Sequence, residues 1–107
     1  MSVKEIKQDQ FDTAIKDHIS IVDFYASWCG PCRMLAPVIE DVSKDFKNID
    51  FFKVNIDDNE QLATKYKIKS IPTVVLFVKN EPINKFMGFM TRDAICQWIK
   101  KNTASLS

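Results

Sequence analysis

The stretch Trp28-Cys29-Gly30-Pro31-Cys32 lies between two segments of different periodicity. Before it, residues 19–26 (Ile-Ser-Ile-Val-Asp-Phe-Tyr-Ala) form a short apolar run rich in β-branched and aromatic side chains, which predicts a buried strand. After it, apolar residues recur at roughly helical spacing: Leu35, Ala36, Ile39, Val42 and Phe46. The two cysteines are therefore expected where a strand passes into the first turn of a helix.

This position predicts different chemistry for the two thiols. The first turn of a helix has N–H groups without partners and the positive end of the helix dipole, so a thiolate there is stabilised. Pro31 suits the first helical position, because no hydrogen bond needs its missing N–H there. We expect Cys29 to face solvent before the helix and Cys32 to be shielded in its first turn. Cys29 would attack the disulfide of a partner, and Cys32 would displace the reduced partner.

Two alternatives to this exchange remain open from the residues alone: a structural disulfide and a zinc site. A structural zinc site takes four ligands. The chain offers three cysteines and one histidine, without a second Cys-x-x-Cys or a histidine pair: Cys29, Cys32, Cys96 and His18. Zinc would need all four of them, so the composition disfavours it.

Length and composition are those of an ordinary globular domain. The 107 residues predict a single domain, 1–107, and the 46% of hydrophobic residues suffice for a core. The net charge of +1 gives no reason to expect nucleic acid or an anionic membrane as a partner. No apolar stretch approaches the roughly 18 residues of a membrane span, and the first residues lack an apolar signal region. We therefore expect a cytoplasmic protein, and in that compartment a Cys-x-x-Cys is more often catalytic or metal-binding than structural.

Asp23 interrupts a strand that is otherwise apolar on both faces, which is typical of a central strand covered on both sides. Its carboxyl group is therefore expected in the core, where a charge costs free energy unless it is neutralised or paired. Asp23 is either a satisfied structural group or a buried acid that exchanges a proton with Cys32. Lys53, in the next predicted strand, is either a surface lysine or the charge partner of Asp23 if the two strands are neighbours.

The remaining elements follow from periodicity and capping residues. Asp9, Asp58 and Thr91 are the expected helix caps, with Gln61 completing a capping box after Asp58. Pro37 predicts a kink. The expected bounds are helix 8–19, helix 31–46, strand 49–56, helix 58–66, a strand from Pro72 to residue 78, turn 79–82, strand 83–89 and helix 91–102.

Three further positions carry a specific expectation. Cys96 lies off the apolar stripe of the last helix, between Arg92 and Lys100. We expect it to be partly exposed, either as an inert thiol or as a site of oxidative dimerisation or modification. Gly30 and Gly88 are the only glycines, so they are expected where a Cβ cannot be accepted, for instance where a partner's backbone approaches closely.

Four stretches match a known family: residues 22–37 (VDFYASWCGPCRMLAP), residues 53–57 (KVNID), residues 71–73 (Ile-Pro-Thr) and Gly88. Through them the chain resembles the thioredoxins over essentially its full length. The resemblance implies an α/β fold, a thioredoxin-like three-layer sandwich with a central five-stranded mixed β-sheet flanked by four α-helices. Residues 3–6 must then form a first strand.

The resemblance implies a general protein-disulfide reductase with Cys29 as nucleophile and Cys32 as resolving thiol. The intervening Gly30 and Pro31 would help to set a reducing potential. An isomerase or oxidase would prefer a more oxidising dipeptide, and a redox-dependent binding module would not need both thiols. The family also implies re-reduction by a thioredoxin reductase, with NADPH used upstream and no cofactor bound to this chain.

Roles outside the cysteine pair also come from the resemblance. Asp23 would assist the deprotonation of Cys32, with Lys53 close by. Pro72 would be cis and packed against the cysteines, and Ile71 would offer its backbone to an extended substrate. The apolar docking groove is implied for Trp28, Ile71, Pro72 and Gly88.

The chain departs from the family pattern at a few positions. Tyr25 stands where many members have tryptophan, and Glu81-Pro82 replaces a common Asn-Gly turn, so we expect a different loop in the last hairpin. Cys96 is extra to the minimal site. We expect a monomer that acts on disulfide-containing client proteins, with Cys96 able to link two copies on oxidation.

Overall fold

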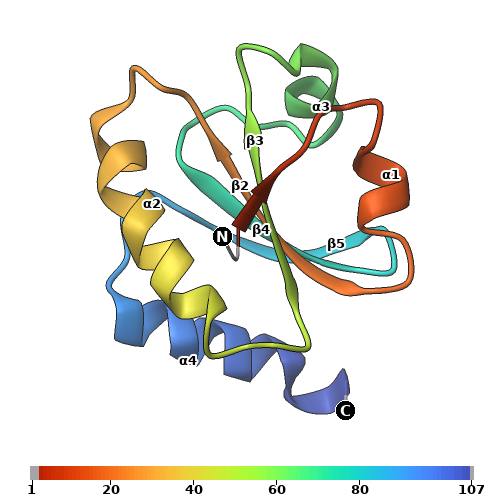
Figure 1. Cartoon of the computed structure of the whole chain (residues 1–107), viewed down its shortest axis with the longest axis vertical. Helices are drawn as coiled ribbons and strands as arrows, with labels where there is room; N and C mark the ends of the chain where they lie inside the picture. The colour runs from red at the N-terminus through yellow and green to blue at the C-terminus, as the bar shows by residue number, and fades with distance from the viewer. Residues whose placement is uncertain (1–2, 107) are drawn as a thin grey trace.

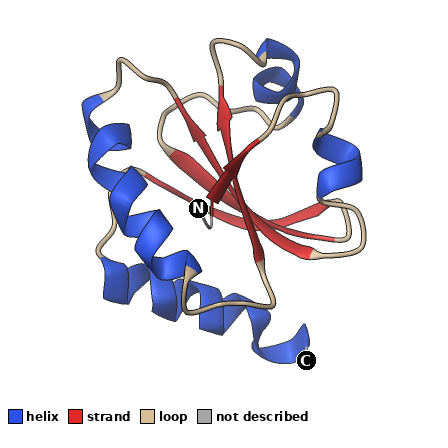
Figure 2. Ribbon diagram, in the orientation of Figure 1, coloured by secondary structure: helices blue, strands red, loops and turns tan. Residues whose placement is uncertain are grey.

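A central sheet separates two layers of helices in the computed structural model, which describes residues 3–106 (Figures 1 and 2). The order of elements is β-α-β-α-β-α-β-β-α, as the sequence predicts. Their bounds are β1 Val3–Glu5, α1 Phe11–Ala14, β2 Ile19–Tyr25, α2 Gly30–Ser43, β3 Asp50–Asn55, α3 Glu60–Lys65, β4 Thr73–Val78, β5 Glu81–Met87 and α4 Arg92–Thr103, followed by a short 3₁₀ turn at Ala104–Leu106. The predicted three-layer sandwich is confirmed.

The sheet is mixed, with the strand order β1-β3-β2-β4-β5. β1, β3 and β2 run parallel, whereas β4 and β5 are antiparallel to their neighbours. β2 therefore lies at the centre with a strand on each side, which explains why its sequence is apolar on both faces. The connection from β2 to β3 passes through α2, so the cysteine stretch lies at the carboxyl end of the central strand.

Alternate residues of β2 face two different hydrophobic clusters. Ile21 packs with residues of α2 and α4, including Leu35 and Ile95. Val22 and Phe24 face the opposite layer, formed by α1 and α3. The period of two along the strand thus divides the core into two halves, one on each side of the sheet.

The first helix is much shorter than predicted. The expected helix 8–19 with an Asp9 cap is wrong, because α1 covers only Phe11–Ala14 and no side chain caps it. Phe11 and Ile15 are fully buried, but the chain then turns so that Ile19 begins β2. Phe11, Ile15 and Ile19 are four positions apart, and this spacing predicted one long helix. The last of the three belongs to the strand β2.

The capping box before α3 is also wrong. The helix follows Asn59 and not Asp58, and the side chain of Asn59 does not cap it. Instead, Asn59 Oδ1 accepts a hydrogen bond from the N–H of Gln8 at 2.8 Å, and its Nδ2 donates to the carbonyl of Asn55. Asn59 therefore ties two loops together, a role that no local pattern indicates.

The last hairpin differs from the expected turn 79–82. Lys79 and Asn80 form a two-residue turn, and both have positive φ, at 50° and 73°. This backbone twist matches that of the flanking strands. Pro82 is therefore inside β5, which it can occupy because β5 is an edge strand.

The two long helices agree better with the sequence. α2 continues through Pro37 and ends at Ser43, earlier than predicted, where the chain enters turns. α4 begins after Thr91, whose side chain accepts a hydrogen bond from the N–H of Ala94, so this predicted cap is confirmed. Within residues 3–106, the helices are too short or too polar to cross a membrane.

Candidate redox site at the start of α2

Cys29 immediately precedes α2, and Cys32 lies in its first turn after Pro31. A disulfide joins the two cysteines, with their Cα atoms 5.2 Å apart. The backbone N–H of Cys32 donates to Cys29 Sγ at 3.2 Å, so this sulfur caps the helix. The predicted transition from strand to helix is confirmed, and negative charge on Cys29 would be stabilised by a helix N–H and by the helix dipole.

Both cysteines are buried, with exposed fractions of 6% for Cys29 and 3% for Cys32. The expectation that Cys29 faces solvent is therefore wrong for this oxidised state. The two side chains form a small cluster with Ala26, against which Ile71 packs. Cys29 Sγ lies 3.8 Å from the carbonyl oxygen of Ile71, so the cluster brings together segments that are far apart in sequence.

Asp23 is buried in β2, with an exposed fraction of 4%, and its Oδ1 has no hydrogen-bond partner. Burial raises the pKa of Asp23 to about 7, and the positive charge of Lys53 partly offsets this rise. The register pairs Asp23 with Lys53 across β2 and β3, so the prediction that the two strands are neighbours is correct. A carboxyl group of this kind takes up and releases a proton near neutral pH.

The residues expected to line a docking groove come from three separate segments of the chain. Ile71–Pro72 is a cis peptide bond, as the resemblance implied. The N–H of Gly88 donates to the carbonyl of Pro72 at 2.8 Å, which brings the end of β5 beside this bond. Trp28 is 66% exposed, and its indole N–H donates to Asp57 at 2.8 Å.

Sequence reasoning did not single out Asp57 or three exposed apolar side chains near the site. Met87 and Phe89 flank Gly88, and Met34 follows Cys32 by two residues. Only their closeness in sequence to Cys32 and Gly88 could have marked them. A large apolar residue is most often part of the core, so the residue type gave no reason to expect exposure. Here all three are exposed, and each lies within two residues of Cys32 or Gly88 in the sequence.

Only one of the two glycines has a structural reason within the chain. Gly88 has a φ of +83°, a backbone conformation that residues other than glycine rarely adopt. A Cβ at Gly30 or at Gly88 would meet no atom within 4 Å. The expectation that a Cβ lacks room is therefore wrong within the chain itself, and only the backbone of Gly88 requires glycine.

The four candidate zinc ligands are not brought together. Cys29 and Cys32 pair with each other, whereas His18 lies 3.8 Å from Asp50 and Cys96 contacts Arg92. In the part of the chain that the structure describes, there is no cluster of three or more histidine, cysteine or acidic residues that would hold a metal ion. This geometry argues against the zinc alternative.

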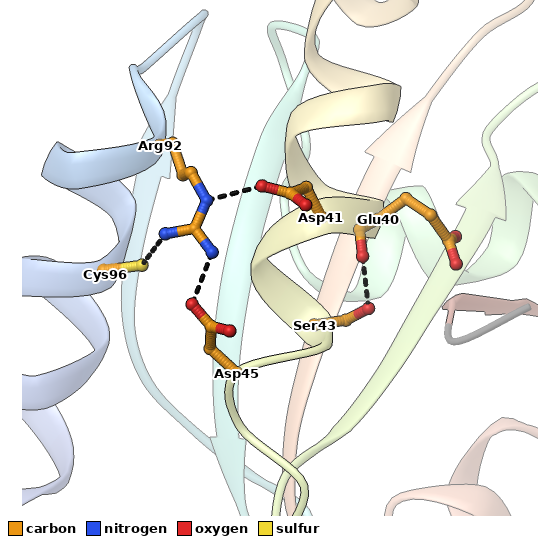
Figure 3. A network of polar contacts seen from close by, with 6 residues as sticks. All are labelled: Glu40, Asp41, Ser43, Asp45, Arg92 and Cys96. Atoms are coloured by element: carbon orange, nitrogen blue, oxygen red, sulfur yellow. Dashed lines mark hydrogen bonds and ion pairs between the residues drawn. The ribbon is translucent and has the colours of Figure 1, made fainter.

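Cys96 is partly exposed on α4, as predicted, and belongs to a separate polar network (Figure 3). Arg92 donates to the carboxylates of Asp41, on α2, and Asp45, just after it, and its Nη1 lies 3.6 Å from Cys96 Sγ. These contacts join α4 to the carboxyl-terminal part of α2. The hydrogen bond and charge of Arg92 hold the pKa of Asp41 below its usual range.

Comparison with known proteins identifies this arrangement. The thioredoxin family model matches residues 2–101. The thioredoxin of Staphylococcus epidermidis is 36% identical over 103 residues, which are 95% of this chain and 99% of that protein. The chain belongs to the thioredoxin family. The thioredoxin of Staphylococcus aureus is 34% identical over the same shares of the two chains.

Solved thioredoxin structures share the fold over nearly their whole length. A point mutant of the thioredoxin from Halobacterium salinarum superposes with a TM-score of 0.88 at 33% identity, covering 95% of this chain and 91% of that one. Chloroplastic thioredoxin z gives a TM-score of 0.86 at 30% identity, covering 97% and 96%. This thioredoxin is thus a protein-disulfide oxidoreductase that works by dithiol exchange at its Cys-x-x-Cys pair and, like other members of the family, binds no cofactor.

Proposed function

We propose that this thioredoxin is a general protein-disulfide reductase in which Cys29 attacks and Cys32 resolves. The Cys29 thiolate forms a bond to one sulfur of the client disulfide, and the other client sulfur leaves as a thiolate. Cys32 then attacks Cys29 Sγ, which forms the intramolecular disulfide and releases the second client thiol. Two electrons pass from the dithiol to the client.

One observation carries the assignment of Cys29 as nucleophile: its Sγ caps α2 by accepting the N–H of Cys32 at 3.2 Å. A thiolate in this position is stabilised by the helix, whereas Cys32 lies inside the first turn. Gly30 and Pro31 complete the turn between them, and we assign this pair a part in setting the reducing potential.

Asp23 is the proposed proton acceptor for Cys32. Its carboxyl group is buried on β2, three residues before Ala26, which packs against both cysteines. Since burial raises the pKa of Asp23 to about 7, the group exchanges protons in the pH range where the thiol must ionise. Lys53 moderates this rise from the neighbouring strand.

Clients dock in extended form on the apolar surface around the disulfide. The cis bond at Ile71–Pro72 and the hydrogen bond from Gly88 hold two loops beside Cys29. Trp28, fixed by Asp57, borders the same surface. Backbone groups of Ile71 would pair with the client, so recognition would depend little on the client's side chains.

The family implies a reductase and client proteins as partners. The reductase proposed here is a thioredoxin reductase that draws electrons from NADPH, and the clients are disulfide-containing proteins. Residues 1–107 act as one thioredoxin domain, a cytoplasmic monomer that contributes to cell redox homeostasis. Oxidation would link two copies through Cys96, which is partly exposed on α4.

The discriminating experiment uses Cys32→Ser to interrupt exchange after the first step. This variant should hold a model disulfide protein as a mixed disulfide through Cys29 that survives denaturation and is released by a thiol reductant. Cys29→Ser should not trap the protein, and Cys96→Ser should behave as wild type. Trapping by Cys29→Ser instead would reverse the two roles, and non-covalent retention by all variants would favour a binding module.

The reduction potential separates a reductase from an isomerase. Equilibration of the Cys29–Cys32 couple with a glutathione or NADPH-linked buffer should give a potential below that of the glutathione pool. A value near those of the more oxidising isomerases would contradict the proposed direction of electron flow.

A further inference from the structure

Three charged residues form a row across the parallel part of the sheet. The register pairs Glu5 of β1 with Lys53 of β3, and Lys53 with Asp23 of β2. Residues paired in this way project to the same face of a sheet. The residues two positions earlier on the three strands all belong to the core cluster beneath α2: Val3, Phe51 and Ile21. The row therefore lies on the face covered by α2, where the redox site is.

Exposure changes steadily along this row. Asp23 is buried, Lys53 is half-buried, and Glu5 is exposed at the β1 edge. Lys53 is thus paired, on its two neighbouring strands, with two acidic residues that differ in their access to water. Because Coulomb interactions are weakly screened on the buried side and strongly screened at the edge, small movements of the ammonium group change its effect on Asp23 most.

Tyr25 fixes the outer part of the row. Its side chain projects to the same face two residues after Asp23, and its hydroxyl donates to Glu5 Oε2 at 2.7 Å. Lys53 Nζ lies 5.9 Å from the centroid of the Tyr25 ring. Burial, followed by the hydrogen bond and charge of Glu5, raises the pKa of Tyr25, so the phenol stays protonated and remains a donor.

We propose that Glu5 and Tyr25 are positioning residues for thiol exchange, which hold the ammonium group of Lys53 between Glu5 and Asp23. The Tyr25 hydroxyl engages the Glu5 carboxylate and prevents it from drawing Lys53 to the edge of the sheet. The distance between the Lys53 ammonium group and the Asp23 carboxyl group is then fixed, and so is the degree to which Lys53 favours ionised Asp23. This inference rests on the proposed role of Asp23 as proton acceptor for Cys32, and it assigns the setting of the working pH range to two residues outside the active-site stretch.

Few other charged or titratable groups among the described residues can influence the ionisation of Asp23. β4 presents Val74, an apolar residue, opposite Asp23. α2 contributes the cysteine pair and Glu40, whose carboxylate accepts a hydrogen bond from the N–H of Val3 at 3.3 Å. The charged and titratable groups to be considered are Lys53, Tyr25, Glu5, Glu40, Cys29 and Cys32.

Two single variants should move the titration of Asp23 in opposite directions. Glu5→Gln removes the competing negative charge, so Lys53 favours ionised Asp23 more strongly and the midpoint falls. Tyr25→Phe keeps the ring but frees the Glu5 carboxylate to attract Lys53, so the midpoint rises. The double variant should match Glu5→Gln, because no carboxylate remains for the phenol to restrain.

The measurement is the carboxyl carbon resonance of Asp23 in the oxidised full chain, followed by NMR against pH. We expect the midpoint to fall by about 0.3 pH units or more in Glu5→Gln, the effect of a unit charge about 10 Å away even at the dielectric constant of water. In Tyr25→Phe no charge is removed, so the midpoint should rise only through the movement of Lys53. The matched controls are Tyr66→Phe, in the opposite layer, and Glu81→Gln, on β5. Both controls should leave the midpoint unchanged. Unmoved midpoints, or shifts of the same sign in both single variants, would overturn the inference.

A second readout separates this inference from the proposed function. The pH dependence of Cys32 attack on a preformed mixed disulfide should follow the Asp23 midpoint, moving to lower pH in Glu5→Gln and to higher pH in Tyr25→Phe. If Asp23→Asn leaves this profile unchanged, the proposed role of Asp23 fails. The NMR titration then still decides whether Glu5 and Tyr25 position Lys53, because it requires no turnover.

Discussion

The two halves of α2 lie beside charged groups of opposite kinds, one buried and without a hydrogen-bond partner for one oxygen, the other exposed and paired. Beneath its amino-terminal half, Asp23 is buried, and one of its carboxyl oxygens has no hydrogen-bond partner. Beside its carboxyl-terminal half, Arg92 pairs with Asp41 and Asp45 at the surface, where water solvates each charge (Figure 3). The first arrangement violates a rule of stable cores, and the second follows the rules of stable surfaces.

The difference shows how reactivity and stability are divided along one helix. An unpaired buried carboxyl group lowers stability once it ionises, but it supplies a proton acceptor near neutral pH. A paired surface arginine contributes little to reactivity or to stability and fixes how α4 lies against α2. Substitutions in the two places should therefore differ in size, in pH dependence and in salt dependence.

The largest effect on stability is expected for Asp23→Asn. The pKa of Asp23 is raised from 3.8 to about 7 in the folded chain, so ionised Asp23 destabilises the fold above pH 7. At pH 9 the variant should be more stable than wild type by about 4 kcal/mol, a gain that declines below pH 7 and disappears near pH 4. Urea denaturation of both proteins at pH 9 and at pH 4 measures this gain. A gain of the same size at both pH values would show that ionisation is not its cause.

Loss of the α4 cap should have an intermediate effect. Thr91 accepts a hydrogen bond from the N–H of Ala94, at the start of the helix that carries Arg92. Thr91→Ala should lower the free energy of unfolding by about 1 kcal/mol, whereas Thr91→Ser keeps the hydroxyl and should remain near wild type. Denaturant titration of both variants tests this, and equal losses would assign the effect to packing.

Removal of the arginine should change stability less. Arg92→Met keeps an aliphatic side chain but removes the pairs with Asp41 and Asp45. We expect a small loss at low ionic strength that largely disappears in about 1 M NaCl, because salt screens exposed charges. Denaturation at both salt concentrations measures this, and a loss unchanged by salt would point to packing between α2 and α4.

The smallest effect on the folded monomer is expected for Cys96→Ser. Cys96 contacts Arg92 at 3.6 Å but is not part of the disulfide or of its apolar surroundings. Turnover and stability should match wild type, while the covalent dimer formed under a thiol oxidant should be lost. Electrophoresis without reductant tests the second point, with Cys29→Ser as the comparison. A dimer that persists in Cys96→Ser would assign the link to the active-site pair.

The strand–turn–helix and the burial of Asp23 could be predicted because both leave local signals. Residues 19–26 are apolar on both faces, so a central strand and a buried carboxyl group follow directly. Thr91 is likewise a capping residue directly before an apolar periodic segment. In each of these cases the deciding interaction lies within a few residues of the signal.

The interactions that prediction missed join distant parts of the chain. Tyr25 contacts Glu5 across 20 positions, Trp28 contacts Asp57 across 29, and Arg92 contacts Asp41 across 51. No periodicity or cap encodes such pairs. The errors in local structure have the same origin, since Asn59 bonds to Gln8 instead of capping α3.

The outer edge of β5 has a consequence for how the protein behaves at high concentration. A strand at the margin of a sheet offers unused backbone groups to any neighbouring molecule, and continued pairing of this kind leads to aggregation. Here Pro82 lacks an N–H, the register with β4 shifts between Leu76 and Phe77, and Lys85 places a charge on the strand. The hairpin that closes the fold thus also makes this edge a poor template for further strand pairing, which helps a protein that exchanges disulfides with client proteins to remain separate from them.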